Sequence, residues 1–216
     1  MVRSTDGGRN WSDPIWLESP GRFYERSHAQ PIELPDGGIL WPTYCLDSRD
    51  SLEFAAIHRS DDSGRTWRVV STLRRAGKSL DEPAIARLAD GRLILVGRPD
   101  GAVFHSNDDG SSWNETGLIP ATGTLKAPRL FVMSDGTVVC AATVGTLCVF
   151  ISTDHGRTWT DSIALDSSAY GYPGGLRLGD DSLLVSYVER GNASSRIFLV
   201  RFRVNDTRDG IELLRR

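Results

Sequence analysis

The 216-residue sequence predicts an all-β fold, built as a β-propeller of consecutive four-stranded blades. Two observations favour this fold: an eight-residue segment ending in tryptophan occurs four times, and a tight-turn segment occurs four times in phase with it. In addition, no long stretch between these segments has the 3.6-residue hydrophobic period of a helix. Two such turns in each repeat of 45 or 46 residues leave room for four short strands, as in one propeller blade.

The tryptophan segments share the pattern Ser-x-Asp-x-Gly-x-(Thr/Ser/Asn)-Trp, and they follow one another at spacings of 56, 46 and 46 residues. The aspartate can accept hydrogen bonds from backbone N–H groups of the loop, and the glycine can adopt a positive φ. The tryptophan can fold back over the hairpin. We therefore expect structural turns at residues 4–11, 60–67, 106–113 and 152–159.

The second set of turns is centred on Asp-Gly or a similar pair, flanked by Leu, Ile and Val, which is a strong hairpin signal. These turns occupy residues 34–40, 88–94, 133–139 and 178–184, at spacings of 54, 45 and 45 residues. We expect them to join the first two strands of each blade, and the tryptophan segments to join the last two. Both kinds of turn then lie on one face of the propeller, and any axial site would lie at the opposite mouth.

Composition excludes several classes of protein. The chain has 25 Lys and Arg against 28 Asp and Glu without long runs of one sign, so neither nucleic acid nor a membrane is an expected partner. We expect no transmembrane helix, and the N-terminus has no signal-peptide pattern. Three cysteines and four scattered histidines have no metal-ligand spacing, so we expect no metal and no cofactor. The compartment stays open: a longer soluble parent protein could be secreted or periplasmic.

The tryptophan segments are Asp-box (BNR) repeats, and the whole chain resembles the six-bladed propellers of the sialidase superfamily. The same repeat occurs in sortilin-type receptors, photosystem assembly factors and non-catalytic binding propellers. The resemblance therefore implies the fold, whereas the function has to be argued from the site.

Four units follow one another at residues 26–73, 82–117, 127–165 and 172–204, after one outer strand from Ser12 to Glu18. This makes about sixteen strands, whereas a closed six-bladed ring needs about twenty-four. We therefore expect residues 1–216 to form one partial propeller domain that lacks its first blade or two. Open blade flanks predict self-association or association with the missing blades.

The hairpin from Asp81 to Pro99 carries the first candidate site residues. Pairing about its Asp-Gly turn places Glu82 opposite Arg98 or Pro99, near the axis and on the face without boxes. The segment resembles the sialidase blade in which a glutamate polarises the nucleophilic tyrosine and an arginine about sixteen residues later grips the substrate carboxylate. A planar guanidinium suits that task because it can hold a carboxylate through two hydrogen bonds. The alternative is a cross-strand ion pair at a blade rim.

The last unit repeats this geometry. Its hairpin places Tyr172 opposite Glu189, and the run is similar to the sialidase segment that carries the tyrosine nucleophile. A neutral phenol avoids the repulsion that a carboxylate nucleophile would feel toward an acidic sugar. The alternative is an axial aromatic side chain that closes the core.

The match to sialidases is incomplete. The third carboxylate-binding arginine of the family opens a strand that here runs from Val144 to Val149 and contains no arginine. Arg129, on the same blade, substitutes for it only if it points to the axis. The family's Arg-x-Pro arginine and acid/base aspartate would precede Met1. Five other residues fall on loops of the same face, where they could line a mouth, although we expect solvated loop charges: Arg26, His28, Asp47, Arg49 and Asp50.

The resemblance implies a retaining glycoside hydrolase acting on terminal sialic acid or a related acidic sugar, with a glycan as its partner. In the intact parent, Tyr172 would attack the anomeric carbon, Glu82 would act as its base, and Arg98 with Arg129 would bind the substrate. We do not expect the 216-residue chain alone to complete this chemistry. The alternative is a non-catalytic Asp-box propeller whose mouth binds a glycan or a protein.

Overall fold

A computed structural model describes residues 1–167, 169–189 and 196–214, and in these residues it contains strands and turns but no helix. The predicted all-β fold is confirmed. No helix in the described residues could therefore cross a membrane. The strands are β1 (Tyr24–Arg26), β2 (Ile32–Glu33), β3 (Ile39–Leu46), β4 (Phe54–Ser60), β5 (Arg68–Leu73), β6 (Asp81–Arg87), β7 (Leu93–Arg98), β8 (Ala102–Ser106), β9 (Asn114–Leu118), β10 (Lys126–Val132), β11 (Val138–Val144), β12 (Thr146–Ser152), β13 (Ile163–Asp166), β14 (Ala169–Arg177), β15 (Leu183–Glu189), β16 (Arg196–Val204) and β17 (Ile211–Leu214).

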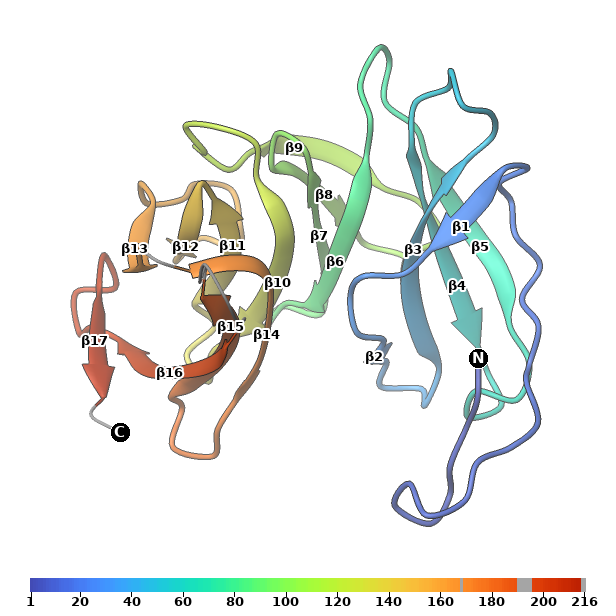
Figure 1. The fold of residues 1–216 in the computed structure, drawn as a ribbon, viewed down its shortest axis with the longest axis horizontal. Helices are drawn as coiled ribbons and strands as arrows, with labels where there is room; N and C mark the ends of the chain where they lie inside the picture. Colours follow the sequence, from blue (N-terminus) through green and yellow to red (C-terminus); the bar gives the residue numbers. More distant parts are fainter. Residues whose placement is uncertain (168, 190–195, 215–216) are drawn as a thin grey trace.

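These strands form four antiparallel sheets that follow one another along the chain (Figure 1). Three sheets have the simple orders β6-β7-β8-β9, β10-β11-β12-β13 and β14-β15-β16-β17. In the first sheet the inner strand is split, because β1 and β2 both pair with β3, which is followed by β4 and β5. The inner strands β6, β10 and β14 contact one another in turn, so the sheets are arranged as propeller blades round a common axis.

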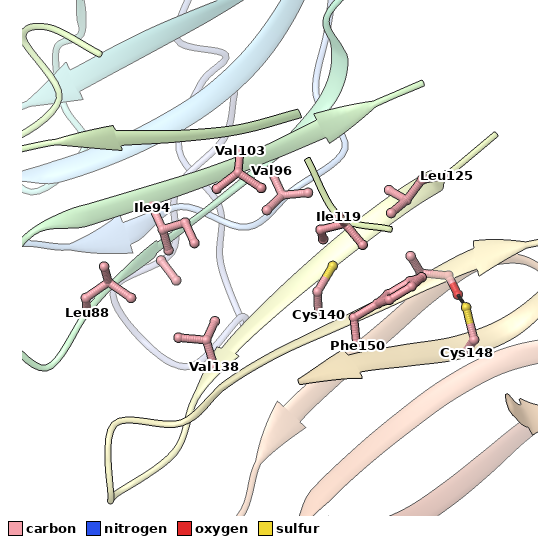
Figure 2. Packing of buried hydrophobic residues seen from close by; sticks show 12 residues of the cluster. Leu88, Ile94, Val96, Val103, Ile119, Leu125, Val138, Cys140, Cys148 and Phe150 are labelled. Atoms are coloured by element: carbon pink, nitrogen blue, oxygen red, sulfur yellow. Dashed lines mark hydrogen bonds between the residues drawn. The ribbon is translucent and has the colours of Figure 1, made fainter. Parts of the chain in front are cut away.

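Neighbouring sheets bury an apolar layer between their faces. In β7, Leu93 and Leu95 pack into the layer shared with the first sheet, whereas Ile94 and Val96 pack into the layer shared with the third. Figure 2 shows this second layer, which Phe150 of β12 also fills. Alternate residues of a strand point to opposite faces, so a strand with a neighbour on each side is apolar throughout. Each fully buried side chain of this size contributes about 1.5–3 kcal/mol.

The Asp-boxes form the compact turns that their sequence predicts. In the box at residues 152–159, Ser152 Oγ accepts a hydrogen bond from Gly156 N at 2.8 Å and donates one to Asp154 at 2.9 Å. Asp154 also accepts the N–H of Thr158 at 2.9 Å, and the Trp159 indole donates to the Gly156 carbonyl at 3.1 Å. The serine, aspartate and tryptophan of the repeat are therefore hydrogen-bonded within the turn itself.

The boxes also fasten each sheet to the sheet before it. The Gly156 backbone lies so close to the Ile94 side chain of β7 that a Cβ at this position would collide with Ile94 Cδ1. The neighbouring His155 carbonyl is hydrogen-bonded to His105 Nε2 of β8 at 2.7 Å. In the box before it, the Gly110 carbonyl accepts the Ser71 hydroxyl of β5 at 2.6 Å. The glycine of the repeat is thus required both by its positive φ and by close contact between sheets.

The two kinds of turn lie on the same side of the sheets, as expected. The Asp-Gly hairpins join β2 to β3, β6 to β7, β10 to β11 and β14 to β15, and the boxes join β4 to β5, β8 to β9 and β12 to β13. Because sequential strands are antiparallel, all these turns lie at equivalent strand ends. Figure 1 shows the β2–β3 and β14–β15 turns at its lower side.

Two expectations about the ends of the chain are wrong. The predicted strand from Ser12 to Glu18 does not form. Instead, the segment after the first box makes two backbone hydrogen bonds to the residues before it, from Ser12 N to Arg3 O and from Ile15 N to Met1 O. Only three residues precede that box, which is too short a partner for a regular ladder. The last unit extends beyond residue 204, because β17 adds a fourth strand after a polar turn.

Candidate active site

The site is built on one position that recurs in every sheet. Six residues before the first apolar residue of each Asp-Gly hairpin stand His28, Glu82, Ala127 and Tyr172. In β6, β10 and β14 the pairing with the next strand shifts at this position, which marks a β-bulge. Each of these three residues precedes a proline, which lacks the N–H that a regular ladder needs. The bulges bring Glu82, the Tyr172 hydroxyl and the backbone N–H of Ala127 to a common point.

Glu82 lies at the centre of this arrangement and is 1% exposed. Its Oε1 accepts the Tyr172 hydroxyl at 2.5 Å and Arg98 Nη1 at 3.1 Å. Its Oε2 accepts the backbone N–H of Ala127 at 2.8 Å. Groups from three sheets thus converge on one buried carboxylate, which they hold in place with one positive charge and two neutral donors.

The backbone of Glu82 has a φ of 46°, in the left-handed region that non-glycine residues rarely adopt. Ala127, at the equivalent position of the next sheet, has a φ of 52°. Strained backbone of this kind costs on the order of 1–3 kcal/mol and is concentrated at functional sites.

Tyr172 combines a fixed hydroxyl with an open ring. The side chain is among the exposed large ones, at 58%, and its ring lies 5.2 Å from the imidazole of His28. The hydrogen bond to Glu82, together with burial of the hydroxyl, raises the pKa of Tyr172 to about 12. The phenol is therefore protonated near neutral pH, and Glu82 is the acceptor of its hydrogen bond.

The predicted pairing of Tyr172 with Glu189 is wrong. Ala169 is the residue that pairs with Glu189, and the register then shifts between Tyr170 and Gly174. Tyr172 lies within this bulge, where simple counting from the turn no longer applies. The side chain of Glu189 lies outside the described part of the chain.

Arg98 pairs across the hairpin with Asp81, one residue away from the predicted partner Glu82. Asp81 Oδ2 lies 3.8 Å from Arg98 Nη1. The bulge turns Glu82 toward the same guanidinium, so that Glu82 Oε1 lies 3.1 Å from Arg98 Nη1. Arg98 Nε is buried and makes no hydrogen bond. The guanidinium is therefore fixed through Nη1 by Glu82, whereas its Nε–H remains available to donate a hydrogen bond to another group.

Arg129 lies on β10 and donates Nε to the carbonyl of Pro173 at 2.9 Å. It therefore reaches the residue beside Tyr172 and lines a small cavity between the inner strands. Its Nη1 is buried without a hydrogen-bond partner, and burial lowers the pKa of Arg129.

Unsatisfied polar atoms concentrate at this site. Within the described residues, five buried side-chain nitrogen or oxygen atoms have no hydrogen-bond partner, and four of them surround the Tyr172–Glu82 pair: His28 Nε2, Asp81 Oδ1, Arg98 Nε and Arg129 Nη1. Buried polar groups in folded proteins are almost always satisfied by protein, water or ligand. A clustered exception therefore marks a place where the polar groups of a bound molecule would be accommodated.

For His28, the sequence analysis preferred a solvated loop residue to one that lines the mouth, and this preference is wrong. It is half-buried against Tyr172, and burial and then the charge of Arg129 lower the pKa of His28 to about 4, so the imidazole is neutral near pH 7. The sequence signal that could have identified His28 as a site residue is its position, which is six residues before its hairpin, as for Glu82.

Of the other loop residues, Arg26 lies over the Tyr24 ring at 4.4 Å and acts on Tyr44, a tyrosine that the charges of Glu82 and Asp81 also reach. Arg49 lies 5.7 Å from the Phe23 ring, Asp47 pairs with Arg74, and Asp50 is exposed. Among the described residues, no group of three His, Cys, Asp or Glu side chains could hold a metal ion.

Comparisons with known proteins agree with this fold. The profile of the BNR repeat-like domain matches residues 1–185. A sialidase of Bacteroides fragilis (strain YCH46) is 30% identical over 132 residues, covering 53% of this chain and 22% of that protein. A sialidase of Micromonospora viridifaciens is 27% identical over 208 residues, covering 80% of this chain and 30% of that protein. The chain thus spans less than a third of the length of these curated relatives.

Solved structures share the fold at low identity. An α-L-arabinanase of Penicillium chrysogenum, complexed with arabinobiose, has a TM-score of 0.67 at 19% identity, over 88% of this chain and 66% of that one. A protein of unknown function from Dyadobacter fermentans DSM 18053 has a TM-score of 0.70 at 20% identity, over 99% and 71%. A sialidase of Streptococcus pneumoniae has a TM-score of 0.59 at 20% identity, over 79% and 30%.

The profile match covers most of the chain, and four phased boxes and four antiparallel blade-like sheets accompany it. The chain therefore belongs to the BNR repeat-like domain family.

Proposed function

We propose that this chain carries the nucleophile and its base from a retaining glycoside hydrolase that acts on terminal sialic acid or a related acidic sugar. The observation that carries the proposal is the 2.5 Å hydrogen bond between the Tyr172 hydroxyl and Glu82, inside a cluster of unsatisfied polar atoms. The two curated relatives are named sialidases, and a solved structure with this fold is an arabinanase with a bound disaccharide. These names support a glycan as the ligand.

The first half of the reaction uses the Tyr172–Glu82 pair. Tyr172 Oη forms a bond to the anomeric carbon while its proton passes to Glu82, and the glycosidic C–O bond breaks. The leaving oxygen keeps the bonding electron pair and takes a proton from a general acid, to which we assign no described residue. In the second half, water attacks the anomeric carbon and loses a proton to the conjugate base of the same general acid, the phenol–carbon bond breaks, and Glu82 returns its proton to the departing phenolate oxygen.

A tyrosine nucleophile suits an acidic substrate. Two-carboxylate glycosidases present a negative nucleophile to the sugar, and a sugar that is itself a carboxylate would be repelled. The Tyr172 phenol is neutral until it reacts, because Glu82 raises the pKa of its hydroxyl. The negative charge of the pair therefore lies on Glu82, where the positive charge of Arg98 compensates it, and not on the atom that attacks the sugar.

Arg98 and Arg129 would bind the substrate carboxylate. Each keeps a buried N–H donor without a partner, Nε in Arg98 and Nη1 in Arg129. A charged carboxylate that satisfies such donors gains charge-assisted hydrogen bonds, and it removes the penalty of leaving them unpaired.

The test is hydrolysis of fluorogenic aryl glycosides by the 216-residue chain, comparing an α-sialoside with an α-L-arabinofuranoside and a β-galactoside. An aryl leaving group departs without help from a general acid, so we expect slow turnover of the α-sialoside even though this chain alone is not expected to complete the reaction on a natural glycan. Tyr172→Phe and Glu82→Gln should each reduce this turnover to the background rate. Tyr187→Phe is the matched control, because the Tyr187 hydroxyl is also hydrogen-bonded to a carboxylate, that of Asp166 rather than Glu82. Exclusive turnover of a neutral glycoside would contradict the acidic-sugar assignment. Glycan binding without turnover of any substrate would favour a non-catalytic binding propeller.

A further inference from the structure

Asp81 and Glu82 are adjacent in the chain, yet both carboxylates face the same guanidinium. In a regular strand, neighbouring side chains point to opposite faces of the sheet. The positive φ of Glu82 and the bulge that follows Asp81 remove this alternation. Arg98 Nη1 therefore lies 3.1 Å from Glu82 Oε1 and 3.8 Å from Asp81 Oδ2. Only the shorter of these is a hydrogen bond.

Asp81 is buried and incompletely satisfied. It is 7% exposed, and its Oδ1 has no hydrogen-bond partner. The mechanism proposed above gives it no task. A buried carboxylate left in this state is costly unless it is protonated or gains a partner.

The charges around Asp81 make the protonated form accessible. The groups that act on it are Arg98 from β7, Glu82 from β6 and Glu53 from the segment before β4. The nearby Tyr44 hydroxyl of β3 is affected by Arg26 of β1 and by the charges of Glu82 and Asp81. The charge of Arg98 thus acts on three carboxyl groups, those of Asp81, Glu82 and Glu53. Burial first, and then the charges of Glu53 and Glu82 against the opposing charge of Arg98, raise the pKa of Asp81 to about 6.

We propose that Asp81 is a positioning residue whose proton decides how Arg98 is shared: protonated Asp81 leaves the guanidinium to Glu82 and an anionic ligand, and ionised Asp81 competes for it. Ionised Asp81 places a second negative charge 3.8 Å from the group that must receive the ligand carboxylate. Neutral Asp81 removes both the competition and the repulsion. The identity of the ligand rests on the proposed function, whereas the link between Asp81 and Arg98 does not.

This arrangement couples ligand binding to proton uptake. An anion bound at Arg98 favours the protonated form of Asp81, and by reciprocity the protonated form favours the anion. The affinity for an acidic ligand should therefore fall as pH rises through the titration of Asp81. The loss is limited to tenfold for each pH unit, because a single proton is involved.

The first experiment needs no ligand. Carboxyl ¹³C resonances of aspartate-labelled protein are followed from pH 3 to 8, with Asp81→Asn to assign the Asp81 signal, and the ¹⁵Nε resonance of Arg98 is followed alongside. We expect Asp81 to titrate near pH 6 and the Arg98 signal to move with the same midpoint. A midpoint below about 4.5, or an Arg98 signal that does not respond, would overturn the proposal.

The second experiment measures binding of free N-acetylneuraminic acid, whose carboxylate stays ionised between pH 5 and 8. We expect the wild-type affinity to fall at least tenfold across this range, and the Asp81→Asn affinity to stay within threefold. Asp161→Asn, at an exposed aspartate in another sheet, should follow the wild type. An Asp81→Asn protein with the full pH dependence would refute the role of Asp81. Absence of binding in every variant would contradict the proposed ligand, and the NMR titration would then decide the link to Arg98.

Discussion

Glu82 is the residue on which the site depends, because its two oxygens gather donors from β7, β10 and β14. A buried carboxylate with such partners is fixed in position, so the hydroxyl that it orients is fixed as well. The exposed ring of Tyr172 is thereby anchored at its hydroxyl.

The pKa of Tyr172 should respond to this contact. Glu82→Gln removes the negative charge and weakens the hydrogen bond that raises the pKa of Tyr172 to about 12. We expect the Tyr172 pKa in this variant to fall toward the ordinary value of about 10. The measurement is a titration of ¹³Cζ-labelled tyrosine by NMR, with Tyr172→Phe to assign the signal. An unchanged Tyr172 midpoint in Glu82→Gln would mean that the two groups are not coupled.

Asp81 should make stability depend on pH. Its pKa of about 6 in the folded chain is higher than the unfolded value of about 3.9, so the folded state binds the proton more tightly. This contribution to stability is present below about pH 4 and is lost as pH rises through 6. Asp81→Asn should therefore be more stable than wild type by about 1–2 kcal/mol at pH 8, with little of this difference at pH 4. Urea unfolding at both pH values checks this; an equal difference at both would exclude Asp81 as its cause.

At the scale of single elements, the pairing of β6, β10 and β14 with the next strand is regular except for a bulge at the candidate site. The sequence predicted the hairpins from their turns, and counting outward from Asp90-Gly91 brought Glu82 and Arg98 to the same strand ends. The count failed by one residue at Asp81, because a bulge adds a residue to one strand only. The prolines at positions 83, 128 and 173 were the available signal for these interruptions.

His28 illustrates the same limit. Its loop position and polarity suggested a solvated residue, whereas its burial depends on Tyr172 from the last sheet and Arg129 from the third. Contacts between sheets far apart in the chain do not follow from local pattern. The repeat phase does place His28, Glu82, Ala127 and Tyr172 at equivalent positions, and this comparison across repeats predicts a site better than any single segment does.

The Asp-box glycine provides a test of how elements are joined. Gly156→Ala introduces a Cβ that would collide with the fully buried Ile94 side chain of the neighbouring sheet, at a position with a φ of 83°. We expect a loss of about 2–4 kcal/mol in unfolding free energy. Gly145→Ala is the control, since Gly145 also has a positive φ but has no atom within 4 Å of the added Cβ, so only about 1 kcal/mol should be lost. Equal losses, measured by urea unfolding, would mean that the box does not fasten the sheets.

At the scale of the whole molecule, the sheets depend on face-to-face packing, and the last sheet has an uncovered face. Leu176, Ile197 and Leu199 lie on that face and are 52%, 78% and 51% exposed. Apolar side chains gathered in this way favour association.

We therefore predict that the chain self-associates at micromolar concentration. Ile197→Lys combined with Leu199→Lys should shift the population toward monomer without lowering the melting temperature, because both side chains point away from the core. Sedimentation velocity over a concentration series measures this. A wild-type chain that stays monomeric throughout would show that this face is not an association surface.

The overall architecture was the most predictable level, since the phased turns determine strand number, strand order and the face on which the turns lie. The ends of the chain were predicted least well, because the short first segment and β17 carry no repeat signal of their own.

The central claim is that Tyr172 is the nucleophile and Glu82 its base. A 3-fluorosialosyl fluoride would trap the intermediate, because the fluorine at C3 slows its hydrolysis more than its formation. After incubation, digestion and mass spectrometry should find one added sugar on the peptide that contains Tyr172, and none in Tyr172→Phe. A label on Glu82 or any other carboxylate, or no label on a chain that still hydrolyses the α-sialoside, would contradict this account.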